Sequence, residues 1–176
     1  MNPQFPAFKK IITNPIRFAF FKLVKLPAAF IAGLKVGYID EYKTVILVKH
    51  GWINQNPFNS MYFAVQAMAA EMSTGLFPVG QTYKRNPPVS MLVVGIEAKF
   101  VKKATGLIAF TCNDGLLVTQ TIEEAIATKQ GKTIVCESVG TNAQGEIVAV
   151  FNITWSFKSN KYENFFSWCR QNGNRV

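Results

Sequence analysis

The chain has little histidine and little cysteine, and these shortages exclude several kinds of site. His50 is the only histidine among 176 residues, so a zinc site built from several histidines is excluded. The three cysteines, Cys112, Cys136 and Cys169, are far apart and odd in number, so neither a metal-binding spacing nor a disulfide framework follows. Cysteine used in this way is typical of a reducing compartment, and we expect a cytoplasmic protein without a metal ion.

Formal charge is almost absent from the middle of the chain. Between Lys49 and Lys84 the only charged side chain is Glu71, and its neighbours are small, apolar, amide or hydroxyl residues. Burial in such surroundings raises the pKa of a carboxyl group, and a raised pKa suits a general base or a nucleophile near neutral pH. A structural ion pair is the other interpretation, with Arg85 or Lys35 as the partner. Glu71 is therefore the first candidate for chemistry.

The positive charge is concentrated at the N-terminus. The net charge is +9, and residues 1–49 hold eight Lys and Arg against Asp40 and Glu41, which gives +6 for this segment. A basic segment attracts phosphate groups, although a solvated surface is the plainer interpretation. The basic residues are not interleaved with aromatics in a nucleic-acid reader motif, so we expect no nucleic-acid partner. A length of 176 residues with 49% hydrophobic content predicts one domain with a sizeable core.

The first 36 residues form a basic and apolar extension. Residues 3–8 contain two prolines and are expected to be irregular, whereas Asn14–Pro15 is a typical helix start. The helix that follows is apolar over most of its circumference, but Lys22 and Pro27 interrupt it well short of the roughly 20 residues that a membrane span needs. Two interpretations stay open: an interfacial helix in peripheral contact with a membrane, or a helix that covers one edge of a sheet.

A long helix is predicted after a turn at residues 54–59. It begins at Asn59 or Ser60 and runs to about Thr74, with Gly75 as the expected terminator. Helical spacing places four of its residues along one stripe: Ser60, Ala64, Ala67 and Glu71. The small residues of this helix allow its backbone to approach a surrounding surface closely.

Strands are predicted on both sides of this helix. A β-branched run predicts one strand over Tyr38–Trp52. Alternation predicts a strand over Met91–Lys102, with an apolar face of Leu92, Val94, Ile96, Ala98 and Phe100. Further elements are expected as strands at Gly106–Cys112, Thr133–Thr141 and Glu146–Phe157, and as helical segments at Gln120–Lys129 and Tyr162–Arg170. One long helix against an antiparallel sheet is an α+β layout.

This order of elements, with its Asn-rich turn and single acid, resembles the hotdog fold of the PaaI-type acyl-CoA thioesterases. In that family a turn supplies an Asn, a His-Gly-Gly opens the central helix, and an Asp or Glu follows on the helix. Asn56 lies six residues before Tyr62, and Glu71 lies nine after it, which matches the family spacing. Residues 98–106 resemble the strand, turn and glycine of the family, and residues 140–154 resemble its closing hairpin.

The resemblance covers residues 37–158 and implies a hotdog domain, an antiparallel sheet wrapped around one long central helix. Residues 1–36 are then an extension with an extra N-terminal helix, and residues 159–176 are a tail or a short helix. The sequence departs from the family where Tyr62-Phe63-Ala64 replaces His-Gly-Gly. A backbone N–H survives a change of side chain, but the Phe63 ring would crowd the site.

The resemblance implies hydrolysis of a thioester. Glu71 would be the general base or the nucleophile, and backbone N–H groups near Phe63 and Ala64 would hold the developing oxyanion. Asn56 would orient the water or the carbonyl group, and Tyr62 would donate a hydrogen bond in place of the family histidine. Family sites lie at subunit interfaces, so a homodimer or a tetramer is implied.

Coenzyme A is implied only as part of the substrate, with no separate cofactor. Four basic residues in loops are candidates to meet its phosphates: Lys84, Arg85, Lys102 and Lys103. The alternative function is a non-catalytic hotdog protein that binds acyl-CoA or lipid. Phe63, the apolar helix and the basic N-terminal segment favour that alternative.

Overall fold

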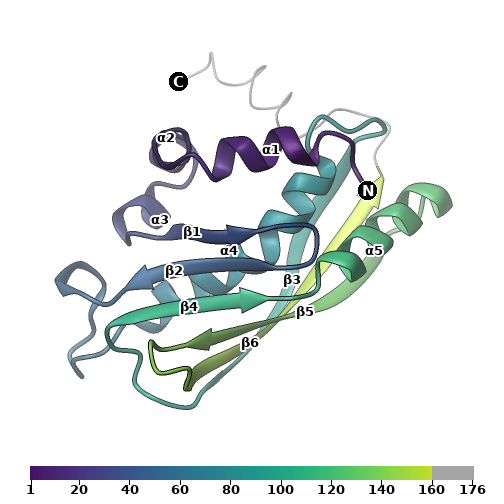
Figure 1. The fold of residues 1–176 in the computed structure, drawn as a ribbon. Coiled ribbons are helices and arrows are strands. Elements are labelled where there is room, and N and C mark those ends of the chain that lie inside the picture. Colours follow the sequence, from purple (N-terminus) through teal and green to yellow (C-terminus); the bar gives the residue numbers. More distant parts are fainter. Residues whose placement is uncertain (160–176) are drawn as a thin grey trace, which may run out of the picture.

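The computed structural model describes residues 1–159, and the helix predicted at 162–170 lies outside that range. Within it, three short helices precede a six-stranded sheet and a long helix (Figure 1). The helices are α1 (Phe5–Ile12), α2 (Pro15–Lys25), α3 (Pro27–Ile31), α4 (Phe63–Thr82) and α5 (Gly115–Thr128), with a 3-10 turn at Trp52–Asn54. The strands are β1 (Lys35–Ile39), β2 (Thr44–Lys49), β3 (Val89–Phe100), β4 (Leu107–Cys112), β5 (Lys132–Thr141) and β6 (Ile147–Ser159).

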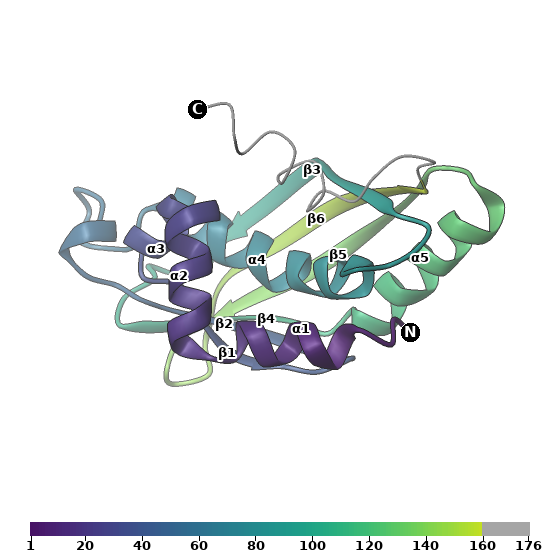
Figure 2. The ribbon, with the colours of Figure 1, turned by 90° about the horizontal axis from the view of Figure 1, so that it is seen from above.

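The sheet wraps around α4. Its strand order is β1-β2-β4-β5-β6-β3, and every neighbouring pair is antiparallel. The predicted antiparallel sheet around one long helix is therefore confirmed (Figures 1 and 2). The order places β1 and β3 at opposite edges, and each of these strands has one side that no strand of the described chain covers.

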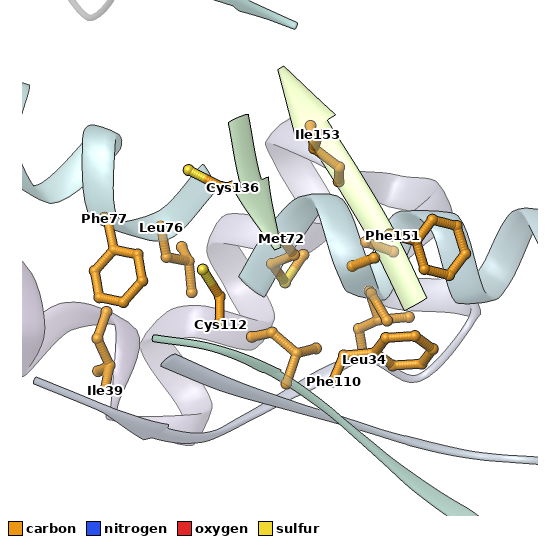
Figure 3. Packing of buried hydrophobic residues seen from close by; sticks show 14 of the residues in the cluster. Leu34, Ile39, Met72, Leu76, Phe77, Phe110, Cys112, Cys136, Phe151 and Ile153 are labelled. Carbon is orange, nitrogen blue, oxygen red and sulfur yellow. The ribbon is translucent and has the colours of Figure 1, made fainter. Parts of the chain in front are cut away.

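Small residues let α4 lie close against the strands. Ala69 and Ala70 are fully buried, and a Cβ atom on Gly75 would stand 3.1 Å from the Trp155 ring. Figure 3 shows side chains of α4 among those of the sheet: Met72, Leu76 and Phe77 lie beside Ile39, Phe110, Cys112, Cys136, Phe151 and Ile153. Apolar burial of this kind is the main favourable term in folding.

The predicted limits of the long helix are wrong at both ends. The helix begins at Phe63, with Tyr62 as the N-cap, because the residues before it form a separate loop. It continues through Gly75 and Pro78 to Thr82. The glycine does not end the helix, because its missing Cβ makes room for Trp155. Tertiary packing overrides the local stop signal.

Two further elements differ from the sequence prediction. The expected single strand over Tyr38–Trp52 is two strands, β1 and β2, because Asp40 makes a turn between them. Its Oδ1 accepts hydrogen bonds from the backbone N–H groups of Tyr42 at 2.8 Å and Lys43 at 2.7 Å. Residues 3–8, expected to be irregular, enter α1 at Phe5, where buried Phe5 and Phe8 pack against α4.

The predicted apolar face of the strand after the long helix is also wrong. A bulge between Val93 and Gly95 in β3 shifts the register with β6, and a one-residue shift exchanges the faces of a strand. Ile96, Ala98 and Phe100 therefore pair with the buried residues Ile153, Phe151 and Ala149, whereas Leu92 pairs with Ser156 on the other face. Ile96, Ala98 and Phe100 nevertheless remain exposed.

The N-terminal helices follow their sequence signals. The Asn14 side chain accepts a hydrogen bond from the backbone N–H of Arg17 at 3.0 Å, which confirms the predicted N-cap of α2. Pro27 separates α2 from α3, as predicted. Figure 2 shows α1 beside α4. Among residues 1–159, none of the helices combines the length and the hydropathy that crossing a membrane requires.

A hydrogen bond between two buried hydroxyl groups links α4 to β5, and its removal should lower the stability of the protein. Ser73 Oγ donates a hydrogen bond to the Ala70 carbonyl oxygen at 2.8 Å. Because this bond uses the only hydroxyl proton of Ser73, Ser73 Oγ accepts a hydrogen bond from Ser138 Oγ at 2.7 Å. We expect Ser73→Ala to lower the free energy of unfolding by about 1–3 kcal/mol, because the Ser138 hydroxyl is left buried without a partner. Urea unfolding measures this change.

The matched variant is Ser73→Ala combined with Ser138→Ala, which removes both hydroxyl groups. It should be more stable than Ser73→Ala alone, since no orphaned hydroxyl is left. A double variant that loses the sum of the two single losses would contradict this account.

Candidate functional site

A hydrogen-bonded loop leads into α4. Asn56 Oδ1 accepts from the backbone N–H of Phe58 at 2.9 Å and from both the N–H and the hydroxyl of Ser60 at 3.3 and 3.2 Å. The loop is fixed at its end because the Met61 N–H donates to the Ala104 carbonyl at 2.8 Å. The Asn56 side chain is thus occupied in holding this turn. Its amide nitrogen lies 3.5 Å from the Met61 carbonyl oxygen.

The N-terminus of α4 has no side-chain cap. The N-cap Tyr62 makes no capping hydrogen bond, and the first turn contains no acid. Within the described part of the chain, the backbone N–H groups of Phe63 and Ala64 have no acceptor. Two donors and the positive end of the helix dipole are therefore available at this point.

A cavity of about 710 Å³ opens beside this helix start. Residues 55–58, 60–63 and 100–104 line it, together with Gln66. Three sequence-predicted residues, Asn56, Tyr62 and Phe63, thus share one cavity. The ring of Phe63 packs edge-on against Tyr62 and Phe100, with ring centres 4.8 and 6.5 Å away. The cavity wall is strongly aromatic where the resembled family has glycine.

Gln66 is a site residue that the sequence analysis missed. Its side chain is 5% exposed, lines the cavity, and donates from Nε2 to the Met61 carbonyl at 3.2 Å. That bond fixes the orientation of the amide, and Oε1 has no hydrogen-bond partner within residues 1–159. A buried acceptor without a partner is rare. The available signal was an amide one turn into an otherwise apolar helix.

The carboxylate of Glu71 lies farther along α4. Burial raises the pKa of this carboxyl group above its ordinary value of 4.5. One of its oxygens borders Gly75, close to the Trp155 ring. Among residues 1–159 the carboxylate has no hydrogen bond and no ion pair. The side chain is thus half-buried, and the ion-pair interpretation finds no support among the described residues.

One chain does not bring Glu71 and the helix start together. Phe63 and Glu71 are eight residues apart, which is about 12 Å along the axis of an α-helix. Glu71 does not line the cavity. A base and an oxyanion donor must both lie about 3 Å from the reacting group. Ala64 and Ala67 are half-buried on the same stripe as Glu71, so the surface between the two ends of the site is partly open.

The four predicted phosphate-binding residues separate into two pairs. Lys102 and Lys103 line the cavity. Lys102 Nζ lies 2.7 Å from both carboxylate oxygens of Glu146, and Lys103 Nζ donates to the Phe58 carbonyl at 3.0 Å. Lys84 and Arg85 follow the C-terminus of α4 instead, far along the chain from the cavity.

Arg85 does not line the cavity, and it forms an ion pair elsewhere. Arg85 Nη2 forms an ion pair with Glu123 Oε2 at 2.5 Å. Among the described residues, no three His, Cys, Asp or Glu side chains lie close enough together to hold a metal ion.

Solved structures share this architecture. A protein of unknown function from Pseudomonas aeruginosa, named a probable thioesterase, has a TM-score of 0.69 at 20% identity and covers 85% of this chain and 99% of its own. A protein of unknown function from Chlorobaculum tepidum has a TM-score of 0.68 at 16% identity, with coverages of 85% and 99%. A thioesterase from Haemophilus influenzae has a TM-score of 0.57 at 11% identity, with coverages of 81% and 90%.

These likenesses confirm that the chain has the hotdog fold. No protein-family model matches the chain, and no curated protein matches it. At such low identities the shared property is the fold alone, because one fold carries many functions. The function must be argued from the site.

The desolvation of the half-buried Glu71 carboxylate predicts a pH dependence of stability. Below the ordinary pKa, the Glu71 carboxyl group is neutral in both the folded and the unfolded chain. As the pH rises, the unfolded chain ionises first, and stability falls until the raised pKa of the folded state is passed. Glu71→Gln removes this loss, so urea unfolding should show the variant more stable than the native protein near pH 7, with the gain disappearing near pH 4.

The control is Glu137→Gln, which removes an exposed carboxylate and should leave the pH profile of stability unchanged. A Glu71→Gln variant that is less stable than the native protein at pH 7 would contradict this prediction, because it would show that the ionised carboxylate has a stabilising partner.

Proposed function

We propose that this protein is an acyl-CoA thioesterase in which Glu71 is the general base or the nucleophile. The observation that carries the proposal is the half-buried Glu71 carboxylate, which is desolvated and has no partner among residues 1–159. A desolvated charge of this kind is unfavourable unless it is compensated, and functional sites are where such groups are retained. The likeness in fold to a named thioesterase from Haemophilus influenzae supports the same reaction class.

The oxyanion would be held at the start of α4. The N–H groups of Phe63 and Ala64 are free in the described chain and lie at the positive end of a 20-residue helix. Such donors stabilise the negative charge that develops on a thioester oxygen during attack. Neither donor depends on the side chain, so the change from glycine to Phe63 leaves the electrostatics of this part intact.

A second copy of the chain would complete the site. Glu71 and the helix start are about 12 Å apart along one helix, so a base and a donor must come from different subunits. The free edge of β3 carries the exposed residues Ile96, Ala98 and Phe100. An apolar edge strand with unpaired backbone groups is suited to pairing with another strand. We propose a homodimer formed through β3, with pairing of dimers into tetramers as the larger alternative.

The cavity would receive the coenzyme A part of the substrate. Gln66 Oε1 is a buried acceptor, and the pantetheine arm of coenzyme A carries amide N–H donors that would satisfy it. Lys102 and Lys103 at the cavity wall would meet phosphate oxygens. Lys84 and Arg85 keep this role only as a sequence prediction, and so does the cytoplasmic location.

One observation favours a second function, binding of acyl-CoA or lipid without hydrolysis. The Phe63 ring lies at the cavity wall, with Tyr62 and Phe100 beside it. An aromatic wall is suited to an acyl chain, and it occupies space next to the proposed oxyanion donors. Turnover is what separates the two functions.

Glu71→Gln should abolish hydrolysis and preserve binding. Removal of a general base lowers the rate by about 10²–10⁴-fold, while the neutral amide keeps the shape of the side chain. Release of free thiol from a panel of acyl-CoA substrates measures turnover, and titration calorimetry measures affinity. Glu137→Gln should be as active as the native protein. A native protein that binds acyl-CoA tightly and releases no thiol would establish the non-catalytic alternative.

Two substitutions at Phe63 should distinguish the contribution of its side-chain ring to activity from that of its backbone N–H. Phe63 is the first residue of α4 and follows an extended Tyr62, so proline is compatible with the backbone there. Phe63→Pro removes the donor and should lower thiol release about 10²–10³-fold. Phe63→Ala keeps the donor and should remain active. Equal rates for the two variants would exclude this N–H from the oxyanion site.

The same variant tests whether the site is shared between subunits. Glu71→Gln and Phe63→Pro subunits are each inactive as homodimers. In a mixed dimer, one of the two sites would combine an intact Glu71 with an intact helix start. Random exchange of equal amounts should therefore restore about one quarter of the native activity in a two-fold symmetric dimer. No restored activity in verified mixed dimers would place both groups in one subunit.

A further inference from the structure

Helix α2 turns its most apolar side chains toward solvent. The exposed fractions of Ile16, Phe20, Leu23 and Val24 are 80%, 68%, 52% and 57%. Their spacing of 4, 3 and 1 residues places them within an arc of roughly 100° on a helix of 3.6 residues per turn. We call these four residues the α2 stripe. Single exposed apolar residues need no explanation, but a contiguous row of four marks an interaction surface.

The outward orientation of the stripe is fixed from behind. Phe18 and Lys22 lie on the inner side of α2 and are buried. Lys22 Nζ donates to the Leu34 carbonyl, and it lies 5.2 Å from the Phe18 ring centre and 5.9 Å from that of Phe30. Burial lowers the pKa of this amine. A lysine is therefore held inside while four apolar side chains face water, which reverses the usual arrangement.

Positive charge lies along one side of the α2 stripe. The first acidic residue of the chain is Asp40, so residues 1–39 contain bases but no acid. Arg17 and Lys25 are exposed on α2 itself, and Lys10 and Lys35 are exposed on the segments that flank it. An apolar row with cations along one side of the same helix is complementary to a surface that is apolar inside and anionic at its rim.

We propose that α2 docks on an anionic lipid bilayer. The α2 stripe enters the boundary between headgroups and acyl chains, while Arg17 and Lys25 meet the anionic headgroups. The helix has 11 residues and is about 16 Å long, and because its apolar row runs along one face, it lies in the plane of the bilayer surface. This inference does not rest on the proposed hydrolysis, because none of its residues belongs to the candidate site.

A second copy of the chain is a less suitable occupant. A two-fold contact through the α2 stripe would set Arg17 and Lys25 of both copies against one another, and like charges repel. The strand order also separates this surface from the proposed dimer edge. α3 leads into β1, which lies at the opposite side of the sheet from β3.

Vesicle sedimentation tests the proposal with the full chain. We expect the native protein to sediment with vesicles of phosphatidylserine and phosphatidylcholine, and to bind vesicles of phosphatidylcholine alone roughly tenfold more weakly. Phe20→Ser combined with Leu23→Ser should reduce binding to the anionic vesicles roughly tenfold or more, because the apolar stripe is lost. Leu116→Ser combined with Leu117→Ser, two positions on α5 that are each 51% exposed, should bind like the native protein.

Charge is tested by a second matched pair. Arg17→Glu combined with Lys25→Glu should weaken binding to the anionic vesicles and leave the weak binding to phosphatidylcholine unchanged. Lys129→Glu, an exposed position outside the N-terminal helices, should have little effect. A stripe that binds both kinds of vesicle equally, with no effect of the reversed charges, would overturn the assigned role of Arg17 and Lys25.

A fluorescence measurement covers the case in which the serine variants fail to fold. Phe20→Trp replaces one large exposed aromatic by another, and its emission should shift to the blue and be quenched by brominated phosphatidylserine vesicles, in excess of the native protein. Absence of both changes would overturn the proposal. So would a lowered sedimentation coefficient of folded Phe20→Ser/Leu23→Ser protein without vesicles, because it would show that the α2 stripe joins copies of the chain.

Discussion

The close approach of α4 to the sheet is the constraint on which the rest of the structure depends. Ala69 and Ala70 are fully buried, and Gly75 leaves room for the Trp155 ring. Trp155 in turn donates from its indole nitrogen to Thr74 Oγ1 at 3.0 Å, so the contact is both apolar and directional. A larger side chain at these positions would push the helix away from the strands. The curvature of the sheet, the depth of Glu71 and the direction in which the start of α4 points all follow from this packing.

The same packing explains why a carboxylate without a partner among residues 1–159 is tolerated. Glu71 sits on a helix that many apolar contacts hold in place, so the unfavourable burial of one charge is a small loss against a large favourable term. The loss would be recovered in function, since a desolvated carboxylate with a raised pKa is a better base near neutral pH. The oxyanion donors at Phe63 and Ala64 follow the same logic, because an uncapped helix end forgoes stability and retains electrostatic potential.

The exposed apolar surfaces have different characters. The β3 edge carries Ile96, Ala98 and Phe100 on the side that faces the layer of α4, which suits a second hotdog domain. The α2 stripe has cations along one side and lies on a helix that precedes the sheet. Charge is the physical distinction between them, because a cationic border repels its own copy and attracts an anionic surface.

The sequence by itself determined the features that depend on a few neighbouring residues. These are the cap at Asn14, the break at Pro27, the hairpin turn at residues 142–145 and the solitary acid at Glu71. It also predicted the fold, through the order of its elements and the spacing of Asn56, Tyr62 and Glu71. The tertiary structure decided what depends on distant partners. Helix α4 continues through Gly75, where the Trp155 ring packs against it. A bulge in the pairing of β3 with β6 exchanges the two faces of β3. The fold leaves Gln66 Oε1 buried without a partner in the described part of the chain, and it brings the Leu34 carbonyl to the inward-facing amine of Lys22. No local pattern encodes these contacts, since each is made between segments that only the folded chain brings together.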